Sequence, residues 1–447
     1  MHSSPENKDI LCLNDKVISM NNNTIIQYLG KIYFPKEESV QEREWKPIIS
    51  YLKDEKKARE ISVLCKKHKI MEVVLTNIQK ASSWSNSALS LLEEKLTQIK
   101  NQHYTTVSPD ERERSLKVID SKDCLIIKGS VLFQIYPEEY TRFQSDIDIM
   151  ARNLPQFWNT LVSSQSQYTY NRIKLYFQDP SHYSASVDLK PKDRKNYRYI
   201  DLHLQPFYIW GGVHLRLDLF KRAKRADGFL IPSIEDQIIM IIAHMANQWT
   251  YRMRDINDFF LLSQSLMIDW KYIENKIKEN SLSDLLSVFI YLTKSIYKEK
   301  FNCPLDVHDL SLQSKLFMYH CFGIGNSWAS ILIQYFFTHQ NYTKLKYKNP
   351  FVEAVKNSIY LVVFHERAFK VNRKVQIKKP KKNEIIVISP LSSHKNQENE
   401  IIPTINVIDT SPQYELLETP IGLFKQISYY GELGKNQHKR TKQRGQG

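Results

Sequence analysis

One short segment, residues 126–150, constrains the fold of this chain more than any other. It reads IIKGSVLFQIYPEEYTRFQSDIDIM: an apolar run, a Gly-Ser turn, the start of a helix, and a second apolar run that carries Asp146 and Asp148. Alternate residues of a β-strand project from the same face, so the two carboxylates point together while Ile147 points into the core. The segment therefore predicts two strands and an acidic pair on one face of a sheet.

The pattern of apolar residues differs before and after this segment. From Trp45 to about residue 100, apolar residues recur at three- and four-residue spacing, which indicates helices. Residues 168–220 hold aromatic and aliphatic runs typical of strands. From Ile231 the helical pattern returns, with Ser233 expected to cap the first helix. We therefore predict an α+β fold, a small mixed β-sheet core flanked by N- and C-terminal helical regions with a loosely ordered C-terminal extension.

These changes in the pattern of apolar residues divide the chain into four expected regions. They are an N-terminal helical region at 1–120, the α/β core at 121–230, a C-terminal helical region at 231–375 and a basic, partly disordered extension at 376–447. No stretch reaches the roughly 18 apolar residues that span a bilayer, and the N-terminus lacks a secretory pattern. We expect a cytoplasmic protein with no membrane span.

The charge balance narrows the choice of partners. The formal net charge is +15, which favours nucleotides, nucleic acid or an acidic peptide as partners. Much of the excess lies in residues 367–382 and 435–444, so an acidic partner for the basic tail is one expectation and a solvated end without a specific role is the other. Five scattered cysteines without Cys-x-x-Cys spacing argue against a disulfide framework and against a zinc site.

The acidic pair itself indicates a metal. Two carboxylates a few ångströms apart repel each other, and a hard divalent cation relieves that repulsion. Mg²⁺ prefers one or two carboxylates together with phosphate oxygens. In the Gly129-Ser130 turn, glycine allows close approach of the backbone to a phosphate, and Lys128 adds a positive charge nearby. The order of these parts predicts a site for a metal and a phosphorylated ligand.

Transfer chemistry with two metals needs a further carboxylate on a neighbouring strand. Asp188, Asp201 and Asp218 all lie in strand-like runs, and spacing alone does not separate them. Asp201 has the clearest surroundings, because apolar residues alternate with Asp201 and His203.

Gly129-Ser130 followed by Asp146-Ile147-Asp148 resembles the signature of nucleotidyltransferases related to DNA polymerase beta. The interval fits best with a poorly characterised bacterial group of that superfamily. Members of that group are similar to residues 45–300 of this chain, and the tail beyond about 375 lies outside the resemblance. Further matching positions are Lys128-Gly129, Tyr136-Pro137, Arg142, Asp201-Leu202-His203, Glu235-Asp236-Gln237, His244 and residues 252–258.

The resemblance implies transfer of a nucleoside monophosphate from a nucleoside triphosphate (NTP) to a hydroxyl or phosphate acceptor, with release of pyrophosphate. The metal would be Mg²⁺, with Mn²⁺ as the alternative. Asp146 and Asp148 would ligate both metals, and Asp201 would ligate the catalytic metal and help to deprotonate the acceptor. The acceptor stays open among a small molecule, a peptide, a protein and an RNA end.

The resemblance also assigns phosphate-binding and supporting roles. Gly129 and Ser130 would bind the β- and γ-phosphates, with Lys128 adding charge. Arg142 would hold phosphate or pair with an aspartate, and His203 would orient the acceptor or a metal-bound water, or simply pack. The rival function is a non-catalytic nucleotide-binding or antitoxin-like interaction protein that keeps the fold.

Overall fold

The computed structural model describes residues 22–33, 42–81, 87–103, 107–118, 123–179, 182–204, 207–208, 213–215, 217–226, 229–248, 252–265, 267–280, 282–305, 384–388, 406–410, 415–419 and 422–429. The helices in this part are α1 (Asn22–Gly30), α2 (Glu42–Leu52), α3 (Glu55–Lys67), α4 (Met71–Ala81), α5 (Ser87–His103), α6 (Pro109–Val118), α7 (Gly129–Leu132), α8 (Leu154–Ser164), α9 (Ile234–Gln248), α10 (Met253–Ser263), α11 (Trp270–Glu279) and α12 (Ser283–Tyr297), with short 3₁₀ turns η3 (Phe133–Ile135) and η4 (Lys298–Lys300).

The strands build one large mixed sheet and a small separate ribbon. They are β1 (Leu125–Ile127), β2 (Asp146–Ala151), β3 (Tyr168–Asp179), β4 (His182–Pro191), β5 (Tyr199–Leu204), β6 (Phe207–Tyr208), β7 (Val213–His214), β8 (Lys224–Ala226), β9 (Phe229–Ile231), β10 (Glu384–Ile388), β11 (Asn406–Thr410), β12 (Glu415–Thr419) and β13 (Gly422–Tyr429). The sheet order is β11-β12-β13-β10-β3-β4-β5-β2-β1-β9-β8, and β6 pairs with β7. At its centre β2 runs parallel to β5 and antiparallel to β1.

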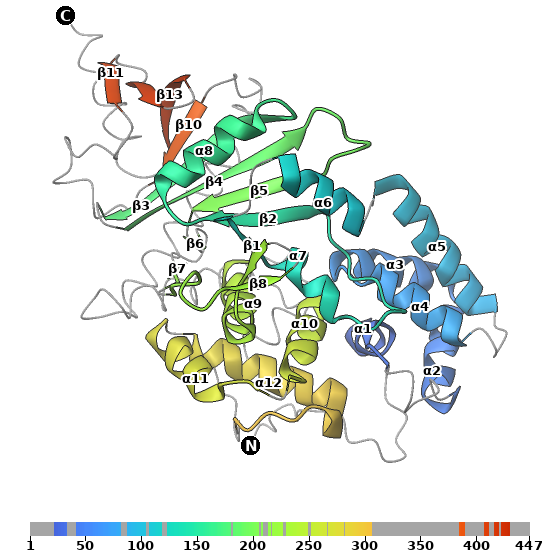
Figure 1. The fold of residues 1–447 in the computed structure, drawn as a ribbon. Helices are drawn as coiled ribbons and strands as arrows, with labels where there is room; N and C mark the ends of the chain where they lie inside the picture. The colour runs from blue at the N-terminus through green and yellow to red at the C-terminus, as the bar shows by residue number, and fades with distance from the viewer. Residues whose placement is uncertain are drawn as a thin grey trace, which may run out of the picture.

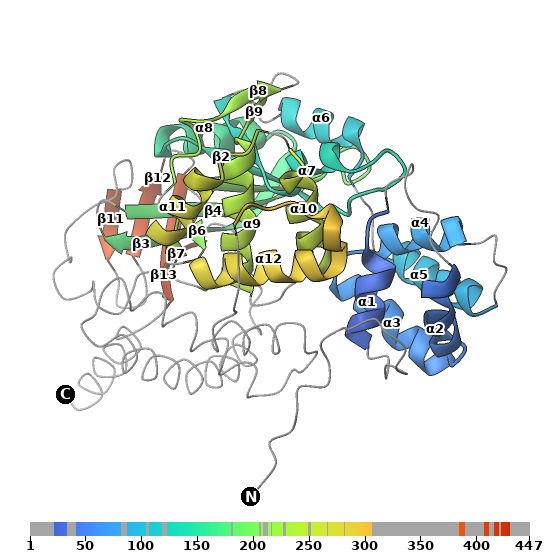
Figure 2. The same cartoon turned by 90° about the horizontal axis from the view of Figure 1, so that it is seen from below.

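Helices cover the two faces of the sheet in different ways. Helix α8 lies over one face of β2, β4 and β5, and α9–α12 lie on the other side (Figure 1). Seen from below, α12 is in front of α9 and α10, and α1–α5 form a group beside them (Figure 2). The first face shares a core with α8, to which Ile147, Phe157 and Leu202 belong. A second core joins the N-terminal helices to α9–α12.

This arrangement confirms the predicted α+β class, a mixed sheet with helical regions before and after it. Ser233 caps α9 as expected, because its Oγ accepts a hydrogen bond from the Asp236 amide at 3.2 Å. The boundaries of the four predicted regions stay a prediction, since both helical regions contribute to one core. None of the helices among the described residues combines the length and apolarity needed to cross a membrane.

Several local expectations differ from the structure. Helices α1 and α6 were not expected. Among the described residues of the strand-like run at 213–220, only Val213–His214 is a strand. Asp218 lies instead in a turn, where its Oδ1 accepts a hydrogen bond from the Lys221 amide at 3.3 Å. In the extension, the short apolar runs form strands, with β10 pairing parallel to β3. The helical segments expected between 306 and 371 lie outside the described residues.

Candidate functional site

The central strands bring the predicted carboxylates together. In the parallel pair of β2 and β5, Asp148 lies directly opposite Asp201 and Met150 opposite His203. The burial of β5 alternates, with Ile200 and the apolar residues after it buried and Asp201 and His203 half-buried. The acidic face is therefore the face turned away from α8, as the alternation predicted.

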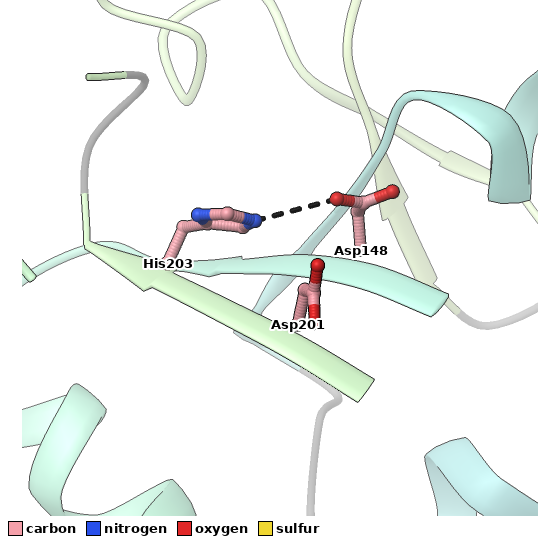
Figure 3. Close-up of side chains that lie close together, drawn as sticks. All are labelled: Asp148, Asp201 and His203. Atoms are coloured by element: carbon pink, nitrogen blue, oxygen red, sulfur yellow. Dashed lines mark hydrogen bonds and ion pairs between the residues drawn. The ribbon is translucent and has the colours of Figure 1, made fainter. Parts of the chain in front are cut away.

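Three side chains on this face could hold a metal ion. Ligand atoms of Asp148, Asp201 and His203 lie within 4.8 Å of one another, and Figure 3 shows all three side chains rising from the same side of the two strands. His203 Nε2 is 3.3 Å from Asp148 Oδ1. Asp146 lines the same cavity but is not part of this group. Its predicted role as a ligand therefore stays a prediction.

The ammonium of Lys128 contacts the same group. Its Nζ donates to Asp148 Oδ1 at 2.6 Å and lies 3.5 Å from His203 Nε2. Lys128 has φ 54° and ψ −130°, a backbone conformation that favours glycine. Such strain is typical of functional turns. It accompanies a lysine that lies against Asp148, Asp201 and His203, the group called the acidic row below. The expected contact of Lys128 with phosphate stays a prediction.

The crowded charges shift the pKa values of Asp148 and Asp201 in opposite directions. Burial, together with Asp148, Asp146 and Asp188, raises the pKa of Asp201 to about 8. Burial also disfavours the charged form of Asp148, but the Lys128 ammonium and the His203 ring outweigh it and lower the pKa of that carboxyl. Two carboxyls with such different pKa values in one place form the electrostatic pattern that a bound cation would relieve.

Burial likewise alters the other two titratable groups on this face. It lowers the pKa of His203, and Lys128 acts in the same direction. Burial and the charge of Asp148 raise the pKa of Asp146. The His203 ring is therefore favoured as neutral, the form of imidazole that ligates metals.

A cavity of about 150 Å³ lies in front of this row. Its opposite wall comes from the first turns of α9, with Gln237 and Met240, and from α10, with Arg254 and Asp255. His244 of α9 also lines it, and burial together with Lys128 lowers the pKa of that histidine to about 3. The cavity is thus enclosed by the sheet on one side and by the C-terminal helical region on the other.

The turn before α7 depends on a buried ion pair. Arg142 donates from Nε and Nη2 to the two carboxylate oxygens of Asp258 at 2.8 and 2.6 Å, and Tyr136 donates to the same Asp258 at 2.8 Å. A Cβ at Gly129 would lie 2.6 Å from Arg142 Nη1, so a larger residue there would displace the paired guanidinium. Of the two roles expected for Arg142, these contacts support pairing with an aspartate, and phosphate binding stays a prediction.

Not every predicted residue reaches the cavity. Ser130 is 1% exposed, and its Oγ accepts a hydrogen bond from Gln144. It lies behind the turn, so its expected contact with phosphate stays a prediction. Of the two other candidates for the third carboxylate, Asp188 lies opposite Asp201 on β4 but is exposed, and Asp218 lies in the turn described above. The register thus favours Asp201.

Sequence reasoning missed Lys69, which lines the cavity from the turn between α3 and α4. It also gave no role to Gln237, whose Oε1 is buried without a hydrogen-bond partner in the described structure. Gln237 belongs to the Glu-Asp-Gln run, which was a usable signal. Lys69 follows other lysines at the end of a helix and gave none.

A scan against protein families matches a model described as "Uncharacterised nucleotidyltransferase" over residues 54–298, more than half of the chain. The chain belongs to this nucleotidyltransferase family. The match includes the acidic row, the Lys128 turn, Lys69 and the α9–α10 wall. The family and the fold indicate a transferase with a nucleoside triphosphate substrate, and the acidic cluster is of a kind typical of such enzymes.

Two solved structures from H. pylori are also similar. One is a "putative nucleotidyltransferase", 14% identical, covering 49% of this chain and 100% of that chain with a TM-score of 0.26. The other is JHP933, 16% identical, covering 51% of this chain and 94% of that chain with a TM-score of 0.27. A search of curated proteins gave no match.

Proposed function

We propose that the protein transfers a nucleoside monophosphate from an NTP to a hydroxyl or phosphate acceptor in a reaction that depends on Mg²⁺. The observation that carries the proposal is the register of the central strands. Asp148 and Asp201 face each other across a parallel pair, and with His203 they offer ligand atoms within 4.8 Å. Separate strands supply these groups, so the sheet itself fixes their spacing.

The donor atoms fit a hard divalent cation. Carboxylate oxygens are ligands that suit both Mg²⁺ and Mn²⁺, and the two aspartates of this group supply them. Asp148 and Asp201 would hold the ion, with Asp146 beside them as a further ligand. When bound, the ion would polarise the phosphate oxygens and stabilise the attacking and leaving oxygens.

The chain's own residues would then position the reactants. The acceptor oxygen attacks the α-phosphorus in line, the bond from that phosphorus to the bridging oxygen breaks, and pyrophosphate leaves with the bond electrons. Asp201 would help to deprotonate the acceptor hydroxyl, as the family resemblance implies. The turn at Lys128 and Gly129 would lie against the phosphates, as the family resemblance implies.

Transfer of label is the direct test. The full-length protein is incubated with Mg²⁺, each labelled NTP in turn, and cell extract as the source of acceptor, while pyrophosphate release is followed. We expect transfer by the natural protein and its loss in Asp201→Asn. Asp218→Asn is the matched control, because it makes the same change at an exposed carboxylate in a turn.

Nucleotide binding without transfer under any condition would favour the non-catalytic interaction protein. Near-normal transfer by Asp201→Asn would contradict the assignment of the site. Separate extract fractions and separate NTPs in this assay would identify the acceptor and the preferred nucleotide. The cytoplasmic location and an acidic partner for the basic tail stay predictions.

A further inference from the structure

Lys69 reaches the cavity from a part of the chain that precedes the sheet. It follows His68 in the turn between α3 and α4. His68 fixes this turn to the beginning of α10: its Nδ1 accepts a hydrogen bond from the Met253 amide at 3.2 Å, and its carbonyl accepts one from the Arg254 amide at 3.4 Å. Burial lowers the pKa of His68 to about 4, so the ring is neutral and Nδ1 can accept. The turn is therefore held in place against the cavity wall.

The backbone of Lys69 is strained. Its φ is 56°, in the left-handed region that costs a lysine free energy and a glycine almost none. A side chain kept at such a position, in a turn anchored on both sides, is a reason to look for a role in binding.

The other cations that line the cavity with Lys69 each form an ion pair with an aspartate. Lys128 pairs with Asp148 at 2.6 Å, Arg142 with Asp258 at 2.6 Å, and Arg254 with Asp255 at 2.8 Å. These pairs line the cavity, and Lys69 makes no ion pair within the described parts of the chain. The contact that it does make is with the ring of Phe143, 5.9 Å from its Nζ to the ring centre.

Both like and opposite charges act on this ammonium. Burial, Arg254 and Arg252 lower the pKa of Lys69 to about 8, and the attraction of Asp146 and Asp255 offsets them only in part. A cation held in a cavity among other cations gains most from an anionic ligand. The carboxylates across the cavity would hold a metal, and the ligand that brings a metal and negative charge together is a phosphate chain.

We propose that Lys69 binds a phosphate of the triphosphate of the nucleotide, so that the N-terminal helical region supplies part of the substrate site. This inference rests on the proposed function. It commits to the nucleotide as the source of the phosphate, and a phosphorylated acceptor is the other source to be distinguished. A lysine ammonium binds phosphate as a point charge and needs no paired geometry.

Binding measurements on the full-length protein test this proposal. Tripolyphosphate and each NTP are titrated calorimetrically, in the presence of Mg²⁺, into the natural protein, Lys69→Gln, Lys69→Met and Lys69→Arg. The methionine variant keeps an unbranched apolar stem beside Phe143 and removes the charge. Lys67→Gln is the matched control, because Lys67 is exposed at the end of α3.

We expect Lys69→Gln and Lys69→Met to weaken binding of both ligands by at least about tenfold. Lys69→Arg should keep most of the affinity, and Lys67→Gln should bind as the natural protein does. Equal thermal unfolding midpoints of the four Lys69 forms would show that folding is unchanged, and a variant that melts early is replaced by the other neutral one.

Natural affinity for tripolyphosphate and NTP in both neutral variants would overturn the proposal. Unchanged NTP binding with a raised KM for the acceptor would assign the phosphate to the acceptor and also overturn it. Failure of the natural protein to bind any NTP would remove the proposed function itself, whereas label transfer with normal binding by Lys69→Gln would remove this inference alone.

Discussion

The two faces of the central strands β2 and β5 differ in what holds them. On the face toward α8, Ile147, Ile149, Ile200 and Leu202 are all 0% exposed and pack into a single core. On the other face, carboxylates crowd together and their pKa values move apart. The first face stabilises the fold, and the second carries electrostatic repulsion that a bound cation would relieve. Substitutions on the two faces should therefore affect different measurements.

The largest effect on stability is expected at the fully buried ion pair between Arg142 and Asp258. Asp258→Ala would leave the buried guanidinium of Arg142 without its partner, which costs roughly 3–5 kcal/mol of unfolding free energy. Denaturant unfolding measures this loss. Asp123→Ala is the matched control, because its pair with Arg225 is exposed and should contribute less than about 1 kcal/mol. Equal losses in the two variants would contradict the structural role of the buried pair.

The next effect separates chemistry from stability. Asp148→Asn should lower turnover about 10²- to 10³-fold, because a group that fixes transition-state charge is lost. The unfolding free energy should fall less than in Asp258→Ala, because the substitution removes the pair of Asp148 with Lys128 but also relieves the crowding of carboxyls beside Asp201. Steady-state kinetics and thermal unfolding are measured on the same preparation. A variant that keeps its activity would show that the acidic face has no role in catalysis.

The next residue along β2, Ile149, points to the face toward α8, so its substitution tests the opposite effect. Ile149→Val removes one methylene from the core and should cost about 0.5–1.5 kcal/mol of stability. Turnover measured well below the unfolding temperature should stay at the natural level. A large fall in turnover without loss of stability would break the separation between the faces.

A smaller effect should appear in the dependence of stability on pH. The pKa of Asp201 is raised to about 8 in the folded protein, above the value of an unfolded aspartate. Its contribution is therefore fully present below pH 4 and is lost as pH rises toward 8. Because water reaches this half-buried side chain, we expect on the order of 1 kcal/mol. Asp201→Asn should remove this part of the slope in protein kept in a metal chelator, and an unchanged slope would contradict it.

The smallest effect concerns the lysine at the acidic row. Its ammonium contacts Asp148 Oδ1, an atom that a metal would also use. Lys128→Gln should therefore bind Mn²⁺ about two- to fivefold more tightly in the absence of nucleotide. Electron paramagnetic resonance of free Mn²⁺ measures the affinity. Weaker binding than in the natural protein would show that the lysine supports the metal rather than competing with it.

The sequence predicted the acidic face well, because strand alternation is a local property. Asp146 and Asp148 share a strand, and the apolar alternation around Asp201 identified its face before any pairing was known. The register that sets Asp148 opposite Asp201 was not predictable in this way. It depends on which strands become neighbours, and that is decided by the whole sheet.

Other parts of the site depend on packing that no short motif records. The sequence left Arg142 with two roles, and only the approach of α10 supplies Asp258 as its partner. In the sequence, Lys69 looks like a solvated lysine at the end of a helix. Its place at the cavity follows only from the packing of the α3–α4 turn against Met253. Helix α6 escaped prediction because only Ser115 and Leu116 are buried, too few to show an apolar stripe.

The pairing of β2 with β5 runs without interruption from Asp146 opposite Tyr199 to Ala151 opposite Leu204. A one-residue deletion within β2 would invert every later side chain, sending isoleucines toward the cavity and a carboxylate toward α8. A point change on one face should act mainly on stability or mainly on turnover, but a change in strand length would damage folding and catalysis together. Insertions and deletions in these six residues should be far more harmful than any substitution there.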